Sequence, residues 1–133
     1  MAGLARVGSS VAFNYYANTS FVRGQFTGAN GSVGTIKFKG LATITRTGEG
    51  AYTFKLLAND GTSALKGFHL KAFNLNAINP ADADGGSGRT IITADALNAS
   101  GTIDFKTYNQ AGVAADVIAV AKLDVEISTE AAS

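Results

Sequence analysis

Apolar and polar side chains alternate along most of this 133-residue chain, and that alternation restricts the folds open to it. A period of two is typical of a β-strand with one buried face, whereas a helix repeats every 3.6 residues. The longest example runs from Val117 to Ile127, where every second side chain is apolar. Only residues 95–98 suggest a helical turn. The sequence therefore predicts an all-β protein.

The same pattern indicates a series of short strands separated by turns rich in glycine. Besides residues 117–127, the candidate strands are 11–15, 20–27, 33–39, 41–46, 51–57, 66–75, 90–94 and 101–109. Asn30-Gly31, Thr47–Gly50 and Asp60-Gly61 are typical turn sequences, and Gly24 marks an expected bulge. Eight to ten such strands favour an antiparallel β-sandwich or jelly roll.

Two strands illustrate which faces we expect to be buried. The buried sides are predicted to hold Tyr52, Phe54 and Leu56 in one strand, and Phe68, Leu70 and Ala72 in the other. His69 and Lys71 then lie on the solvent side of the second strand.

The chain has the length of one domain, and no linker-like stretch divides it. We expect a flexible or docking segment at residues 1–10, the β-domain at residues 11–127 and a flexible tail at residues 128–133. There is no cysteine, which excludes thiol nucleophiles, cysteine-ligated zinc and iron–sulfur clusters. No signal-peptide-like or membrane-spanning apolar run is present, so synthesis in the cytoplasm is expected.

The net charge of +1 argues against a dedicated nucleic-acid-binding protein. The charges are nevertheless unevenly distributed. Residues 1–81 carry eight basic and two acidic side chains, and the remainder carries three basic and eight acidic ones. Either the fold keeps these halves apart and gives the molecule a positive and a negative side, or interleaved strands mix the charges.

Few residues are candidates for chemistry. Asp82 and Asp84 lie in a glycine-rich loop at residues 79–88, but Thr93 stands where a calcium loop of the EF-hand type requires glutamate, so they form only a weak calcium candidate. His69 lacks a nearby nucleophile or carboxylate in sequence and is interpreted as a surface or interface residue. The glycines at 28, 31, 34, 85, 86 and 88 lack the context of a phosphate-binding loop. No catalytic residue, metal site or cofactor is predicted.

A binding role is the alternative to chemistry. Tyr15, Tyr16, Phe21 and Phe26 with Arg23 have the composition of a surface that stacks on bases or sugars, but their strand spacing favours core packing. The apolar N-terminal strand suggests an oligomer or a docked segment. The candidate interface residues are Val11, Phe13, Tyr15, Tyr16 and Arg23.

Two segments carry a family resemblance. Residues 44–54, with the pattern Arg46-x-Gly48-x-Gly50-x-Tyr52-x-Phe54, resemble a hairpin of tailed-phage virion proteins that have small C1q/TNF-like or related β-sandwich domains. Residues 101–117, which end in Asp116-Val117, resemble the segment preceding the last strand in the same group.

The resemblance implies a non-enzymatic virion protein. A capsid decoration (cement) protein is expected, located in the virion, assembled in the host cytoplasm and bound to the major capsid protein or another virion protein. Homo-oligomers, trimers above all, are implied, with no nucleic-acid, membrane or small-molecule partner. The alternatives are the head of a fibre or tail appendage, and a carbohydrate-binding adhesive module that recognises a host glycan. A jelly-roll hydrolase would need paired buried carboxylates, whereas the strand acids Asp104, Asp124 and Glu126 occupy expected solvent positions.

Overall fold

A computed structural model describes residues 11–14, 19–29, 31–77, 89–109 and 111–129. Within these residues the chain forms nine strands and one short helix. The elements are β1 (Val11–Asn14), β2 (Thr19–Ala29), β3 (Ser32–Lys37), β4 (Ala42–Gly48), β5 (Ala51–Leu56), β6 (His69–Ala77), β7 (Arg89–Ala96), α1 (Leu97–Ser100), β8 (Thr102–Tyr108) and β9 (Ala119–Ser128).

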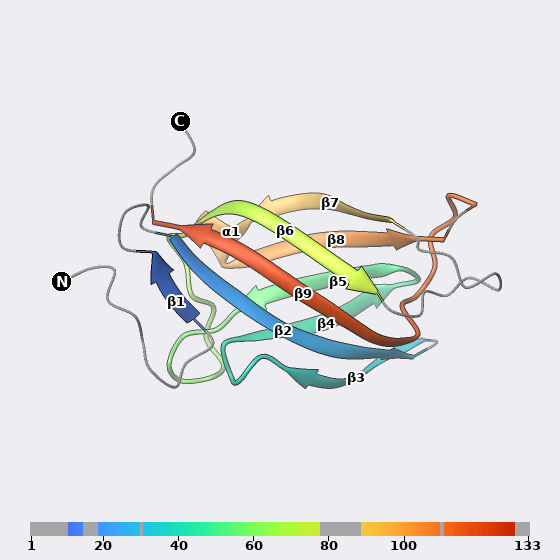
Figure 1. Ribbon diagram of the computed structural model, residues 1–133, viewed down its shortest axis with the longest axis horizontal. Helices are drawn as coiled ribbons and strands as arrows, with labels where there is room; N and C mark the ends of the chain where they lie inside the picture. The colour runs from blue at the N-terminus through green and yellow to red at the C-terminus, as the bar shows by residue number, and fades with distance from the viewer. Residues whose placement is uncertain (1–10, 15–18, 30, 78–88, 110, 130–133) are drawn as a thin grey trace.

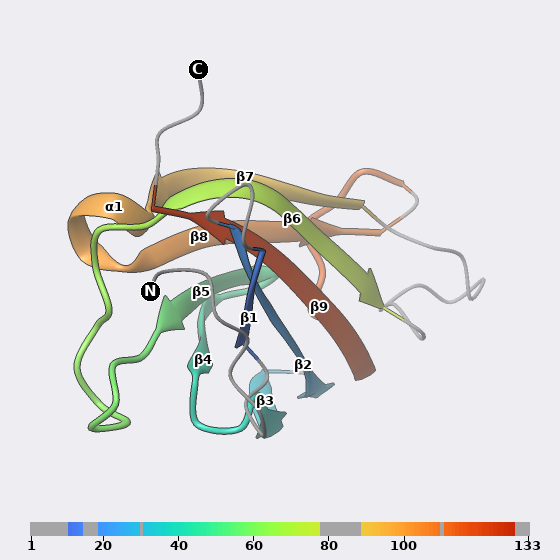
Figure 2. The ribbon, with the colours of Figure 1, turned by 60° about the vertical axis from the view of Figure 1, so that its left-hand side comes forward.

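The strands form two antiparallel sheets packed face to face (Figure 1). Sheet A has the order β1-β2-β9-β6. On one edge of β2, β1 pairs with its first half and β3 with its second half. Sheet B has the order β4-β5-β8-β7. Turned by 60°, the molecule shows the strands of sheet A lying across those of sheet B (Figure 2). The predicted all-β antiparallel sandwich is confirmed.

The interior between the sheets is apolar, as the alternation predicts. Tyr52, Phe54 and Leu56 of β5 are buried as expected, at no more than 2% exposure. Aromatic rings join the two layers: Phe26 of β2 lies 5.8 Å from Tyr52, and Phe73 of β6 lies 5.1 Å from Phe105 of β8. Such tilted ring pairs add to the stabilisation that comes from burying their area.

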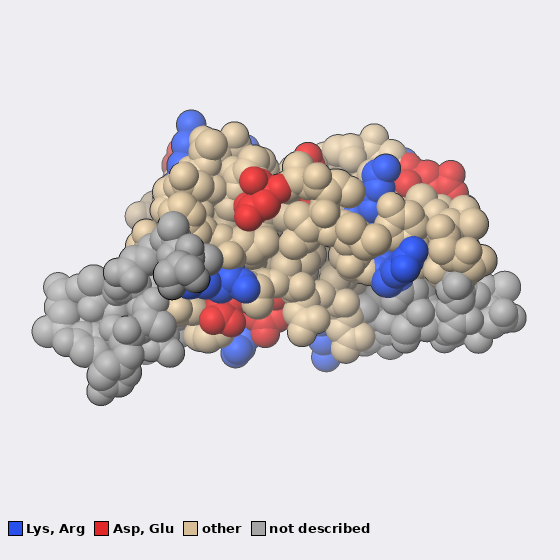
Figure 3. All heavy atoms as spheres, turned by 90° about the horizontal axis from the view of Figure 1, so that it is seen from above, with Lys and Arg blue, Asp and Glu red and all other residues tan. Residues whose placement is uncertain are grey.

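The two differently charged halves of the sequence do not form two sides of the molecule. In sheet A, β9 of the acidic half lies between β2 and β6 of the basic half, and in sheet B, β5 of the basic half pairs with β8 of the acidic half. Arg23 of the basic half pairs with Asp124 of the acidic half, and Arg46 pairs with Asp116. Basic and acidic side chains are accordingly interspersed on the face shown in Figure 3. The charges of the two halves are therefore mixed, which is the second of the two arrangements that the sequence left open.

In β6 the predicted burial pattern is wrong from Ala72 onward. The register with β9 shifts between Leu70 and Ala72, so that Lys71 is an extra residue in a bulge. A bulge exchanges the faces of all the residues that follow it. Phe73 and Leu75 therefore pack on the core, whereas Ala72 is exposed.

Gly24 does not form the predicted bulge. It pairs in regular register with Leu123, and the irregularity in β2 lies between Phe26 and Gly28, on the side that pairs with β3. A Cβ atom at Gly24 would lie 2.4 Å from the ring of Phe38. Gly24 therefore makes room for Phe38, which is 1% exposed and fills the interior beneath it.

β3 ends two residues earlier than predicted because the chain turns at Lys39 and Gly40. Both residues have positive φ, at 53° and 76°, and the amide of Leu41 donates to the carbonyl of Phe38 at 3.0 Å. Positive φ is common for glycine but costs a lysine about 1 kcal/mol.

At the C-terminal end β9 continues to Ser128, one residue past the predicted end of the domain. The helical turn expected at residues 95–98 begins two residues later, since Asp95 and Ala96 end β7 and α1 runs from Leu97 to Ser100. In the part of the chain that the structure describes, no helix is long and apolar enough to span a membrane.

Candidate functional site

One carboxylate lies deep at the end of the sandwich where the β2–β3 and β4–β5 turns meet. Asp116 precedes β9, and its side chain is 2% exposed. It accepts hydrogen bonds from the amide of Gly31 at 2.8 Å, the amide of Gly50 at 2.7 Å and Nε of Arg46 at 3.0 Å. We call Asp116, Arg46, Gly31, Gly50 and Tyr52 the Asp116 cluster. Through the side chain of Asp116, the cluster links the β2–β3 turn, the β4–β5 turn and the segment before β9, which are distant from one another in sequence.

The hydrogen bonds in the cluster decide the charge of Asp116. Burial by itself raises the pKa of this carboxyl group, but the donors Arg46, Gly50 and Gly31 stabilise the anion and hold its pKa below the usual value. The hydrogen bond with Asp116 in turn raises the pKa of the Arg46 guanidinium. Both groups are therefore charged at neutral pH.

Tyr52 connects the cluster to the core. Its hydroxyl oxygen accepts a hydrogen bond from the amide of Val117 at 2.9 Å, while its ring stacks on Phe105 at 5.5 Å. Burial raises the pKa of the Tyr52 hydroxyl. The phenol is thus neutral and acts as a fixed acceptor beside Asp116.

The Asp116 cluster is a structural site. A general acid or base must reach a substrate, and a nucleophile needs an adjacent base. Asp116 is instead enclosed and engaged by three donors from its own chain. Its function is to fix the two turns and the start of β9 relative to one another.

Sequence reasoning did not single out Asp116 as a meeting point. The signal was present nonetheless, because Arg46, Gly50 and Tyr52 belong to the first of the two segments that carry the family resemblance and Asp116 to the second. The structure brings the characteristic residues of both segments into contact.

Most sequence-predicted candidates take no part in this site. Asp82, Asp84, Tyr15 and Tyr16 lie outside the described residues, as do the side chains of Val11 and Phe13. The described part of the chain holds no group of three or more potential metal ligands.

His69 and Arg23, which the structure describes, lie on sheet A. His69 begins β6 opposite Ser128 and is half-buried. Arg23 is exposed, donates to Asp124 at 3.2 Å and covers the ring of Phe21 at 4.9 Å.

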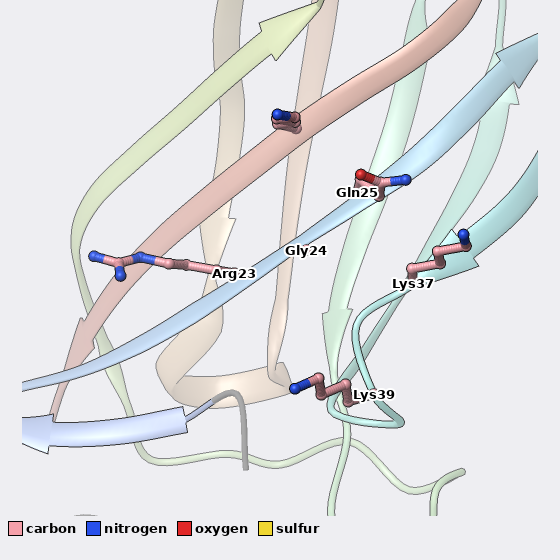
Figure 4. A pocket seen from close by; sticks show the side chains of 6 residues that line it. Arg23, Gly24, Gln25, Lys37 and Lys39 are labelled. Atoms are coloured by element: carbon pink, nitrogen blue, oxygen red, sulfur yellow. The ribbon is translucent and has the colours of Figure 1, made fainter. Parts of the chain in front are cut away.

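Arg23 borders an open depression on the outer face of sheet A (Figure 4). One part is lined by Arg23, Gly24, Gln25, Lys37, Lys39 and Lys122, and the adjoining part by Asn74, Asn76, Leu123 and Asp124 together with Arg23, Gly24 and Lys122. We call this continuous surface the polar depression. Figure 4 shows Gln25 and Lys37 beside each other on neighbouring strands, with Lys39 approaching from the turn after β3. Its polar side chains suit it to binding.

Comparisons of the chain with protein-family models, with curated proteins and with solved structures find no match.

Proposed function

We propose that this protein is a non-enzymatic component of a tailed-phage virion, a capsid decoration protein that stabilises the capsid surface. The observation that carries the proposal is the Asp116 cluster. The two segments resembling virion β-domains are separated by about fifty residues, yet Arg46 and Gly50 of one contact Asp116 of the other. The two segments that carry the resemblance therefore lie together in one three-dimensional unit.

The packing of the described chain agrees with a role in surface contact. Its alternating side chains fill one core, and its most buried carboxylate is engaged in internal hydrogen bonds. Ile91 and Val113 are exposed large apolar side chains, at 43% and 60%. Apolar groups in such positions are suited to contact with further copies or with a capsid protein, in keeping with the homo-oligomer, a trimer, that we propose.

Co-sedimentation with assembled capsids tests the decoration role. The purified protein, added in increasing amounts to capsids of the phage that encodes it, is expected to sediment with them and to saturate at a fixed ratio to the major capsid protein. Light scattering on the free protein is expected to give the mass of an oligomer. Absence of co-sedimentation, or binding that never saturates, would contradict the proposal.

A further inference from the structure

A row of long polar side chains crosses the outer face of sheet A. Lys37 of β3 pairs with Gln25 of β2, Gln25 pairs with Lys122 of β9, and Lys122 pairs with Asn76 of β6. Residues paired in this way point to the same side of a sheet. The row therefore alternates cation, amide, cation and amide over four strands, a span of about 14 Å at 4.8 Å between strands.

Within the described residues, no acidic side chain pairs with the lysines of the polar depression. Arg23 pairs with Asp124, and this is the single ion pair described around the polar depression. Lys37, Lys39 and Lys122 form no salt bridge within the described residues, and all three are exposed. The depression thus offers three cations in excess of its carboxylate to an external anion.

Lys39 supplies independent support. Its φ of 53° is a conformation that suits asparagine or glycine in a tight turn, and lysine adopts it only with strain. Lysine at this position places a cation on the rim of the polar depression. A strained residue beside a candidate surface is evidence for a role in binding.

The other side chains of the polar depression restrict which class of molecule could bind there. Gln25, Asn74 and Asn76 offer amide donors and acceptors, which match hydroxyl groups, while the lysines match carboxylates or sulfates. A protein interface would centre on an exposed apolar cluster, but Leu123, the one large apolar residue in the lining, is 1% exposed.

A single-stranded nucleic acid would require free aromatic faces for stacking. Phe21, on the same face of β2, is already covered by Arg23. Hydroxyl groups and anionic groups occur together along an acidic polysaccharide.

We propose that the polar depression binds an acidic polysaccharide, with Lys37, Lys39 and Lys122 contacting its carboxylates or sulfates and Gln25 and Asn76 contacting its hydroxyl groups. The inference goes beyond the capsid decoration role and does not depend on it. It also assigns glycan recognition to the charged and amide side chains of sheet A and not to the aromatic side chains that the sequence offered for stacking on sugars.

Titration calorimetry with polygalacturonate and heparin, against neutral dextran, tests this proposal. The intact protein is expected to bind at least one acidic polysaccharide, more weakly as salt is raised, and not to bind dextran. The double variant Lys37→Ala/Lys122→Ala is expected to weaken binding by about tenfold or more, the loss of two charge-assisted contacts. The matched control Lys55→Ala/Lys106→Ala removes the same charge from sheet B and should change affinity by less than about twofold.

Two further variants separate binding from folding and from general charge attraction. Lys39→Asn is expected to weaken polysaccharide binding while raising the urea midpoint of unfolding, since asparagine tolerates positive φ. Gln25→Ala/Asn76→Ala should weaken binding of polygalacturonate but not that of polyglutamate. Binding of polyglutamate or single-stranded DNA as tight as that of the polysaccharide would overturn the proposal, as would equal losses in the sheet A and sheet B lysine variants.

Discussion

Replacing Asp116 with alanine is expected to lower the free energy of unfolding by about 2–4 kcal/mol, because a buried carboxylate that accepts three hydrogen bonds is lost. The substitution leaves the amides of Gly31 and Gly50 without an acceptor and Arg46 without its counter-ion. Of these donors, the amide of Gly50 is buried and would lose its hydration without compensation, whereas the donors of Gly31 and Arg46 are only partly buried. Equilibrium denaturation in urea measures the change.

Asp104→Ala is the matched control for this substitution. Asp104 is also a carboxylate that accepts a hydrogen bond from another strand, in this case from the hydroxyl of Thr53 at 2.6 Å, but that contact is exposed. Its loss should cost no more than about 1 kcal/mol. A similar small loss for Asp116→Ala would show that the cluster does not hold the turns together.

The contribution of Asp116 should also depend on pH. Its pKa is lower in the folded protein than in the unfolded chain, where it is about 3.9. The stabilisation that Asp116 provides is therefore complete above the pKa of the unfolded chain and is lost as pH falls through the pKa of the folded protein. The difference in unfolding free energy between the wild-type protein and Asp116→Asn is expected to be largest at neutral pH and to shrink below about pH 4.

Asp60 does not disturb the pH comparison. Hydrogen bonds from Ser63 and Thr62 lower its pKa to about 2, but the group is present in both proteins and cancels from the difference. A difference that stays constant between pH 7 and pH 2 would contradict the assigned role of the Asp116 charge.

Gly50→Ala is expected to destabilise the protein by about 2–4 kcal/mol, combining left-handed backbone strain with overpacking. Gly50 has a φ of 66°, and an added Cβ would lie 2.7 Å from the amide nitrogen of Ala115 and 2.8 Å from the carbonyl oxygen of Thr107. These are backbone atoms, and the amide of Thr107 donates to the carbonyl of Gly50 at 2.8 Å. Moving Thr107 would break this hydrogen bond, and moving Ala115 would break the hydrogen bond of its amide to the carbonyl of Thr107, at 3.1 Å.

Gly48→Ala tests the same hairpin without those constraints. A Cβ at Gly48 would meet only the Cβ of Ala51, at 3.9 Å. Alanine there should leave the free energy of unfolding within about 0.5 kcal/mol or raise it slightly by restricting the unfolded chain. Urea denaturation of both variants gives the comparison, and equal effects of the two substitutions would refute the packing explanation.

For most strands, the face that becomes buried could be predicted from the sequence. In β5 the alternation alone identified Tyr52, Phe54 and Leu56 as core residues, and all three are buried. The prediction failed at Ala72, because the bulge at Lys71 is set by the register with β9, a strand about fifty residues away. Local periodicity carries no information about such a partner.

The candidate sites were less predictable for the same reason. Arg23 was recognised as a candidate interface residue, but its pairing with Asp124 and the row from Lys37 to Asn76 exist only because β9 lies between β2 and β6. Asp116 belongs to the second segment that carries the family resemblance. Its hydrogen bonds to Gly31 and Gly50 nevertheless exist only because two turns meet at one end of the sandwich.

The sequence by itself therefore determined the all-β class, the turns and most of the buried faces, because each of these follows from the order of neighbouring residues along the chain. Only the tertiary structure decided which strands are adjacent, where charges are paired or left unpaired, and which carboxylate is enclosed. Those properties arise from contacts between residues distant in sequence, since alternation specifies the side of a strand but not its neighbour.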